Sequence, residues 1–544
     1  MADELWSGAV TPLTFSLLAD VMAEHMAHRR LSAAGFGEAA GEPVFRLYRG
    51  HVYVNASLVA TVMRELPAPF VTEGLLSLLP AEMRPGLAAS ARSTASPAVL
   101  ATVLSLTARE RGWMPWARAA AFREESARLA LELSRPCDLP SLDDRALAAR
   151  IRFLRERMGG FLDVVSWGVI YAYVFFHLTS HLLERWAGDA SGMAALLAGT
   201  EGIHTFEIHD ELLAAADATR RDPALRAAVV DDPARVAAGR ILDGGLGEVG
   251  SRVRSVLDRH GHRLAGRDLA CPTWRERPEA VLELLRALVV APPHDREASR
   301  AARSAETVRL LDRVGQGMGG FARRSAFAAC LGWCREYYAL RENMRYEADR
   351  FLALFRGAAL EAGRRLAHDG VIESRDDVFF LLADELVAAL EASPRPDLRA
   401  RAAGRRAEHE RFRDEDPPEV IRGDQEPSTS TSPAPEGHSL RGVGVSPGRS
   451  EARARVVLDV ADLESVLDGG FLSARPPDPS WTSALSLAGA IVLEMGGLLS
   501  HGAIVARELG IPAVVDVAGA TRMLRTGDLV TVDGTTGEIS VRPA

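Results

Sequence analysis

Residues 496–515 read GGLLSHGAIVARELGIPAVV and decide the fold of the C-terminal part of the chain. The apolar run AIVLEM just before them predicts a buried strand. Residues 503–509 predict a helix, because Gly510 and Pro512 follow as a typical helix stop. Gly496 and Gly497 permit a tight turn between strand and helix. His501 is therefore expected at, or just before, a helix N-terminus.

A helix N-terminus is a natural site for an anion, phosphate above all, because its backbone N–H groups have no partner within the helix. Ser500 is expected as the N-cap residue. With Gly496, Gly497 and Gly502, it forms the candidate phosphate-binding set. An imidazole at this place can accept a phosphoryl group on nitrogen. The alternative is a histidine that only caps the helix.

The rest of the chain divides by composition into three segments, which predict a multidomain α plus α/β protein. Residues 1–412 have mainly helical periodicity, with one expected hairpin at 44–57 (VFRLYRGHVYVNAS). Residues 413–439 are rich in Pro, Ser, Thr and acidic residues and are expected to be a solvated linker. Residues 440–544 contain short β-branched runs between glycine turns, which predict a small α/β domain.

Composition narrows the possible classes of function. The chain is 47% hydrophobic and 25% charged with a net charge of -9, which argues against a nucleic-acid or membrane-surface binder. Its start, MADELWSGAV, lacks the basic residues of a secretion signal, and the apolar run 164–178 is expected to be a buried helix. Four cysteines suggest neither a disulfide framework nor a metal site, so they are expected as buried residues in the cytoplasm.

The 544 residues contain no lysine, so all 64 basic residues counted as Lys+Arg are arginine. A P-loop lysine and a Schiff-base lysine are thereby excluded. Arginine can clamp phosphate with two hydrogen bonds, but it is a poor proton shuttle because it stays charged.

The C-terminal segment resembles the phosphohistidine domain of the phosphoenolpyruvate-utilising enzymes, a family that includes pyruvate phosphate dikinase, phosphoenolpyruvate synthase and rifampicin phosphotransferase. The resemblance covers GVGVSPGRSEARARVV (442–457), DPSWTSALSLAGAIVLEMGG (478–497), the histidine motif and GDLVTVDGTTGEISV (527–541). It implies a swivelling domain in which His501 is transiently phosphorylated. The sequence departs from the family pattern at Leu493, Gly502 and Asp516, but the histidine itself is retained.

The helical segment resembles the same family at 6–18 (WSGAVTPLTFSLL), 259–282, 340–356 (LRENMRYEADRFLALFR) and 368–386. Leu264, Arg267 and Thr273 replace family residues in the second of these stretches. The resemblance implies that Arg341 and Arg345, one helical turn apart, receive the phosphoryl group from His501. Without it, both arginines would be interpreted as part of a solvated face paired with nearby acidic residues.

Two further pairs of residues are weaker candidates. His262 and Arg263 in the GHR stretch can contact substrate, or can anchor a polar loop. His177 and His181 share one helix face, either as pocket residues or as packing residues. A metal site at His177 and His181 would need a third ligand, which the sequence does not supply, so no metal is expected.

In this family an ATP-grasp domain usually precedes the helical domain. In this chain, the resemblance to the helical domain begins at the first residues. We therefore expect a separate ATP-grasp protein to load His501 from ATP and Mg²⁺, with AMP and phosphate as products, and a small-molecule hydroxyl as acceptor. Neither nucleic acid nor membrane is expected as a partner. Phosphorylation can also activate the acceptor for dehydration or ligation. A non-catalytic phosphohistidine relay and a degenerate scaffold are the remaining alternatives.

Overall fold

The structure is a computed structural model of the 544-residue chain, and it forms two compact units. Unit 1 comprises Met1–Trp167, Gly266–Pro272 and Glu347–Ser432, and unit 2 comprises Gly168–Ala265, Thr273–Tyr346 and Pro433–Ala544. Within these units the structure describes residues 6, 8–33, 41–65, 76, 79–80, 82–90, 108, 114–135, 137–189, 192–264, 267–290, 296–317, 319–413, 418, 420–423, 439–457, 471–474, 485, 488–517 and 519–542.

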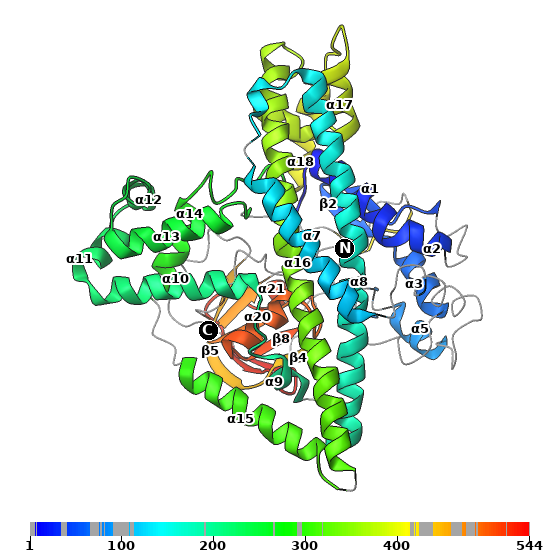
Figure 1. Cartoon of the computed structure of the whole chain (residues 1–544), viewed down its shortest axis with the longest axis vertical. Helices are drawn as coiled ribbons and strands as arrows, with labels where there is room; N and C mark the ends of the chain where they lie inside the picture. The colour runs from blue at the N-terminus through cyan, green and yellow to red at the C-terminus, as the bar shows by residue number, and fades with distance from the viewer. Residues whose placement is uncertain are drawn as a thin grey trace. The chain divides into compact units, whose positions relative to one another are not determined.

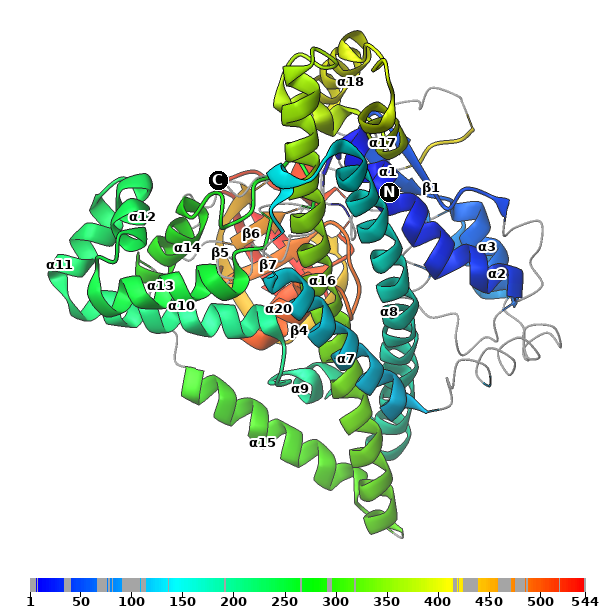
Figure 2. The ribbon, with the colours of Figure 1, turned by 45° about the horizontal axis from the view of Figure 1, so that its top comes forward.

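The C-terminal part of unit 2 is built on an eight-stranded mixed sheet. The strands are β3 (Ser439–Arg441), β4 (Val443–Ser446), β5 (Arg449–Val457), β6 (Phe471–Ala474), β7 (Ala490–Leu493), β8 (Ala513–Val515), β9 (Leu529–Asp533) and β10 (Glu538–Arg542). Their order is β3-β10-β9-β5-β6-β7-β8-β4, and β5 to β8 run parallel. Figure 2 shows β5, β6 and β7 side by side. The predicted small α/β domain is confirmed.

One helix connects the parallel strands β7 and β8. This helix, α20 (His501–Leu509), lies beside β4 and β8 (Figure 1). It ends where Gly510 takes the left-handed conformation with φ 70°, as the sequence predicts. It begins two residues earlier than expected, so that His501 is its first residue.

The helical part of unit 2 surrounds two buried apolar clusters. Its elements are α9 (Met193–Leu197), α10 (His204–Arg221), α11 (Pro223–Arg226), η6 (Ala227–Asp231), α12 (Ala234–Leu242), α13 (Gly247–His260), α14 (Glu279–Val290) and α15 (Arg296–Val314). Figures 1 and 2 both show α10, α11, α13 and α14 as one group. A buried tryptophan, Trp274, packs within this group together with residues of α10 and α14.

Two long helices, α8 (Asp144–Ala187) and α16 (Gly320–His368), each contribute residues to both units. Within unit 2 they contact one another through aromatic rings, for example Tyr171 and Tyr337 at 4.9 Å between centroids. The apolar run 164–178 is helical as predicted, but only 39% of the most apolar part of α8 is buried. Among the described residues, α8 is the one helix long and apolar enough to cross a membrane by length and composition.

Unit 1 contains the predicted hairpin. Strands β1 (Phe45–Tyr48) and β2 (His51–Val54) pair antiparallel, and Arg49 and Gly50 form the turn with positive φ. The other elements of unit 1 are α1 (Pro12–Met22), the π-helix η1 (Ala23–His28), α2 (Arg29–Ala33), α3 (Ala56–Glu65), α5 (Arg84–Ser90), α7 (Pro115–Ser134), η4 (Leu139–Ser141), η7 (Arg375–Phe380), α17 (Ala383–Glu391) and α18 (Arg399–Phe412).

The segment Gly266–Pro272 belongs to unit 1 because Asp268 anchors the start of α1. Its carboxylate accepts hydrogen bonds from the backbone N–H and the hydroxyl of Thr11, and burial raises its pKa.

The predicted linker 413–439 lies mostly outside the described residues, so the boundaries at 412, 439 and 440 stay predictions. Of the four cysteines, Cys330 and Cys334 are buried as expected, whereas Cys271 is half-buried and Cys137 is exposed. The expectation of four buried cysteines was therefore wrong for Cys137, which lies just before η4 at the surface.

Candidate phosphohistidine site

His501 lies at the N-terminus of α20 and is almost completely buried. It follows the loop after β7, where Gly496 has φ 138°. Its Nδ1 forms a hydrogen bond of 2.7 Å with Oε2 of Glu342, a residue of α16. The side chains are only 3% and 1% exposed. The predicted position of His501 at the helix N-terminus is confirmed, and its partner Glu342 lies between the two candidate arginines of α16.

The arginines of α16 are buried beside this pair. Arg341 donates a hydrogen bond to the carbonyl oxygen of Leu499, two residues before His501. Its guanidinium also lies over the ring of Tyr173 on α8, 5.9 Å from the centroid. Arg345 is 9% exposed and acts electrostatically on Glu342. The interpretation of this helix face as solvated is therefore wrong, because α16 turns it toward the loop that carries His501.

Electrostatics keeps the Glu342 carboxylate charged. Burial alone would raise its pKa, but His501, Arg345 and Arg341 lower it to about 2. A carboxylate at Nδ1 favours the tautomer with the proton on that nitrogen, so that Nε2 carries the lone pair. The site therefore combines an oriented imidazole with two cations, which can offset the negative charge of a phosphoryl group.

The loop before His501 matches the phosphate-binding set only in part. Ser500 occupies the N-cap position as predicted, but its side chain forms no capping hydrogen bond. Its hydroxyl is buried and, within the described residues, has no hydrogen-bond partner. It lies against Gly496, where an added Cβ would come within 2.8 Å of it. The phosphate-binding role of Gly496, Gly497, Ser500 and Gly502 stays a prediction.

Comparisons with known proteins bear on both parts of unit 2. Residues 164–342 match the family model of the rifampicin phosphotransferase fourth domain, and residues 468–537 match that of the mobile domain of PEP-utilising enzymes. The chain therefore contains the rifampicin phosphotransferase fourth domain followed by the mobile domain of PEP-utilising enzymes. His501 lies in the mobile domain, and Glu342 is the last residue of the matched fourth domain.

Three relatives show how far this similarity extends. An uncharacterised protein of Mycobacterium tuberculosis is 45% identical over 202 residues, 37% of this chain and 23% of that protein. The rifampicin phosphotransferase of Streptomyces sviceus is 31% identical over 374 residues, 66% of this chain and 42% of that protein. The chondramide synthase of Chondromyces crocatus is 29% identical over 317 residues, 54% of this chain and 8% of that protein. The chain thus spans less than half of each.

The fourth domain also contains both candidate histidines of α8. His177 is half-buried, stacks on Tyr173 with centroids 6.4 Å apart, and has a pKa lowered by burial. Because Tyr173 also lies under Arg341, the structure connects His177 with the arginine beside the mobile domain. His181, one turn later, is exposed. The shared helix face therefore changes from half-buried to exposed between the two residues.

The other candidate pair, His262 and Arg263, lies beside Tyr346, the residue after Arg345. The guanidinium of Arg263 lies 5.8 Å from the ring centroids of both Tyr346 and Trp274, and Arg263 is 1% exposed. The ring of His262 meets Tyr346 edge-on at 4.8 Å. Burial between two aromatic rings makes Arg263 a packing residue in this structure. The substrate-binding role of His262 and Arg263 stays a prediction.

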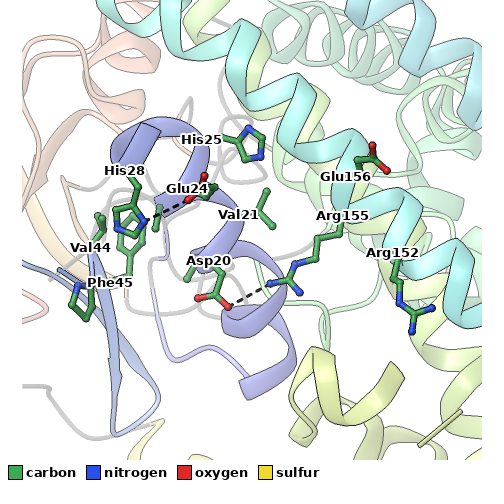
Figure 3. Close-up of a pocket in the computed structure, with 13 residues that line it drawn as sticks. Asp20, Val21, Glu24, His25, His28, Val44, Phe45, Arg152, Arg155 and Glu156 are labelled. Atoms are coloured by element: carbon green, nitrogen blue, oxygen red, sulfur yellow. Dashed lines mark hydrogen bonds and ion pairs between the residues drawn. The ribbon is translucent and has the colours of Figure 1, made fainter. Parts of the chain in front are cut away.

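Unit 1 holds a separate pocket of about 610 Å³ beside the π-helix η1. Figure 3 shows Asp20 pointing toward Arg155, and His28 toward Glu24. Apolar side chains, among them Val21, Val44 and Phe45, form another part of its wall. The volume falls in the range of small-molecule sites. No group of three or more His, Cys, Asp or Glu in the described part of the chain can hold a metal ion.

The contribution of Glu342 could not be predicted from the sequence, because its partner His501 is 159 residues away in the chain. The only local signal was its place between Arg341 and Arg345 on one helix. A buried carboxylate among arginines cannot be distinguished from a surface ion pair by sequence spacing alone.

Proposed function

We propose that the chain is the phosphoryl-carrying component of an ATP-dependent phosphotransferase. His501 would receive a phosphoryl group from ATP bound with Mg²⁺ to a separate ATP-grasp protein, in the cytoplasm, and pass it to a hydroxyl of a small molecule. The observation that carries this proposal is the buried pair of His501 and Glu342 beside Arg341 and Arg345. The similarity to rifampicin phosphotransferases supports it.

The supply of nucleotide by a partner is supported by composition. None of the 544 residues is a lysine, the residue that commonly binds the β- and γ-phosphates of ATP. In this proposal the mobile domain leaves Glu342 for loading, because His501 is only 3% exposed when it is paired. The phosphorylated domain then returns to the fourth domain.

The geometry supports a transfer step in which atoms and charge balance. Glu342 holds the proton on Nδ1, so Nε2 carries the phosphoryl group. The acceptor oxygen attacks phosphorus and the N–P bond breaks, leaving its electron pair on Nε2. Nε2 then takes the proton that the hydroxyl loses, and the resulting imidazolium pairs with Glu342. Arg341 and Arg345 offset the negative charge of the phosphoryl group during the transfer.

The pocket of unit 1 has the size of a small-molecule site, which favours a small-molecule acceptor. Its 610 Å³ and its mixture of apolar and charged walls fit a hydroxylated, partly apolar molecule. Filling it with Val44→Trp should abolish transfer to the acceptor while loading of His501 is retained. Equal transfer by the variant would exclude the pocket as the acceptor site.

A second reaction type is favoured by the relative named chondramide synthase, which matches 54% of this chain. In that alternative the phosphate ester is an intermediate, and phosphate leaves during a dehydration or a bond formation. Product analysis distinguishes the two: a stable phosphate ester supports simple phosphorylation, whereas free phosphate together with a dehydrated or joined product supports activation.

Intact-protein mass spectrometry at neutral or alkaline pH tests the proposal. The chain is mixed with ATP, Mg²⁺ and an active ATP-grasp partner, beside a His501→Ala control. An acid-labile phosphate mass is expected in the native chain and absent in the variant. Rifampicin, the compound named in the relatives, is the first acceptor to add. Absence of phosphate on His501 with a partner shown to be active would contradict the proposal.

A further inference from the structure

The far end of α20 carries a second contact with the fourth domain. Glu508 lies seven residues after His501, about 10 Å along the helix axis. Its Oε1 accepts hydrogen bonds from the backbone N–H groups of Gly199 at 3.0 Å and Thr200 at 3.3 Å. Its Oε2 accepts a further one from Gly199 at 2.9 Å. One carboxylate thus spans two successive N–H groups, which is typical of anion recognition by backbone.

The loop that receives Glu508 is itself connected to the phosphohistidine site. It follows α9, and Gly199 has φ 77°, a conformation that favours glycine. Asn343, next to Glu342 on α16, donates to the carbonyl of Gly202 at 2.7 Å and accepts from the N–H of His204 at 3.1 Å. The same turn of α16 therefore holds both His501 and the loop to which Glu508 binds.

Between these two ends, the contact is buried and mainly apolar, with a polar contact at Arg507. Leu499 and Ile504 of the mobile domain belong to a buried cluster with residues of α8, α9 and α16. Arg507 donates to the hydroxyl of Tyr338 on α16 at 3.2 Å. Apolar contacts have little directionality. They hold the domain against α16 without defining its rotation.

We propose that Glu508 is a positioning residue for phosphoryl transfer, which docks the mobile domain on the N–H groups of Gly199 and Thr200. The inference rests on the proposed function. The polar contacts of His501, Leu499 and Arg507 all reach α16. Glu508 adds a contact with a different element, the loop after α9, about 10 Å from His501, and this fixes the direction of α20. When Glu508 binds Gly199 and Thr200, the mobile domain is held so that His501 pairs with Glu342. When the Glu508 contact is broken, the mobile domain dissociates from the fourth domain more easily.

Accessibility of His501 to diethylpyrocarbonate tests this docking without any phosphate chemistry. The full chain is treated at neutral pH, and modification of each histidine is followed by peptide mass spectrometry. Because His501 is buried when docked, its rate is proportional to the undocked fraction. Glu508→Ala should raise that rate about tenfold, since it removes charge-assisted hydrogen bonds. Glu508→Gln, which keeps one oxygen acceptor, should give an intermediate rate.

Matched variants show whether the effect is specific. Glu451→Ala removes a carboxylate that, within the described part of the chain, accepts hydrogen bonds from Thr531 and Arg542 of the same sheet, so the rate should stay that of the native chain. Gly199→Ala strains the receiving loop and should raise the rate, whereas Gly188→Ala, at a similar φ of 67°, should not. Combining Glu508→Ala with Gly199→Ala should add little, because both remove one contact.

Three results would overturn the proposal. The first is that His501 of the native chain reacts as fast as the exposed His181. The second is that Glu508→Ala leaves the modification rate of His501 unchanged. The third is that Glu451→Ala raises this rate as much as Glu508→Ala does. The proposed function fails separately, by absence of an acid-labile phosphate on His501. If both hold, Glu508→Ala should load His501 at least as fast as the native chain and transfer the phosphoryl group about tenfold more slowly.

Discussion

Glu342 does two things for His501 at the scale of single residues. Its carboxylate selects the nitrogen that carries the proton, and its negative charge stabilises the imidazolium that transfer produces. Both depend on the carboxylate remaining ionised, and its pKa of about 2 ensures this over the physiological range. Glu342 is therefore as much a part of the transfer chemistry as the arginines beside it.

Glu342→Gln should slow transfer from phosphorylated His501 by ten- to a hundredfold, with loading changed less than about twofold. An uncharged amide cannot stabilise the imidazolium, and a hydrogen bond to a charged group contributes about 1.5–3 kcal/mol. The decay of the acid-labile phosphate mass, followed in the presence of an accepted hydroxyl compound, measures this. Equal decay in the variant and the native chain would exclude the role of Glu342.

The raised pKa of Glu347, further along α16, predicts that the free energy of unfolding depends on pH. Burial raises its pKa to about 7, although Arg350 lowers it, and Asp349 raises it further. The folded state therefore holds a proton that the unfolded state releases near its ordinary pKa. Stability must fall as pH rises from about 4.5 to about 7. The unfolding free energy of Glu347→Gln should therefore change with pH by up to about 3 kcal/mol less than that of the native chain.

Urea unfolding of the native chain and of Glu347→Gln at pH 5 and pH 8 tests that prediction. The variant should gain stability relative to the native chain at pH 8 and little at pH 5. Glu361→Gln is the matched control on the same helix, because Arg364 and Arg365 lower the pKa of Glu361 instead. An equal difference at both pH values would contradict a raised pKa at Glu347.

At the scale of elements, the strand–turn–helix unit from β7 to α20 is defined by close packing at one glycine. Gly496 has φ 138°, and an added Cβ would lie 2.8 Å from the Ser500 hydroxyl and 3.4 Å from Val515 Cβ. The turn and the start of α20 therefore need glycine at this position for two independent reasons, conformation and space.

Gly496→Ala should destabilise the mobile domain by about 2–3 kcal/mol and raise hydrogen exchange of the first amides of α20. Gly519→Ala is the control, because Gly519 has a positive φ of 70° but no atom closer than 3.4 Å to the added Cβ. It should cost only about 1 kcal/mol. A cost at Gly496 no greater than at Gly519 would show that the close approach to Ser500 is unimportant.

At the scale of the whole molecule, the predicted linker connects the mobile domain to the helical segment. Docking is then an intramolecular equilibrium, and the docked fraction increases with the effective concentration of the tethered domain. Doubling the 27 residues of 413–439 with a Gly/Ser insertion should lower that concentration about threefold. Diethylpyrocarbonate modification of His501 should accelerate by the same factor, and thermal stability should stay unchanged. An unaltered rate would mean that residues 413–439 do not set the docking equilibrium.

The sequence by itself determined the elements whose causes are local. Strand β7, the glycine turn and helix α20 follow one another within about twenty residues, and hydrophobic period, glycine conformation and a helix stop decide each of them. The hairpin at 45–54 was predictable for the same reason. His501 was identified because its place on α20 depends on neighbours in the chain.

The resemblance placed Arg341 and Arg345 near His501, but only the tertiary structure showed the carboxylates of Glu342 and Glu508 and the burial of the whole group. Glu342 is 159 residues away in the sequence, and Gly199 lies more than 300 residues from the Glu508 that it binds. The spacing of Arg341, Glu342 and Arg345 is the same on a buried helix and on an exposed one. Burial therefore depends on which surface packs against α16, and burial is what turns a row of surface charges into a site for phosphoryl transfer.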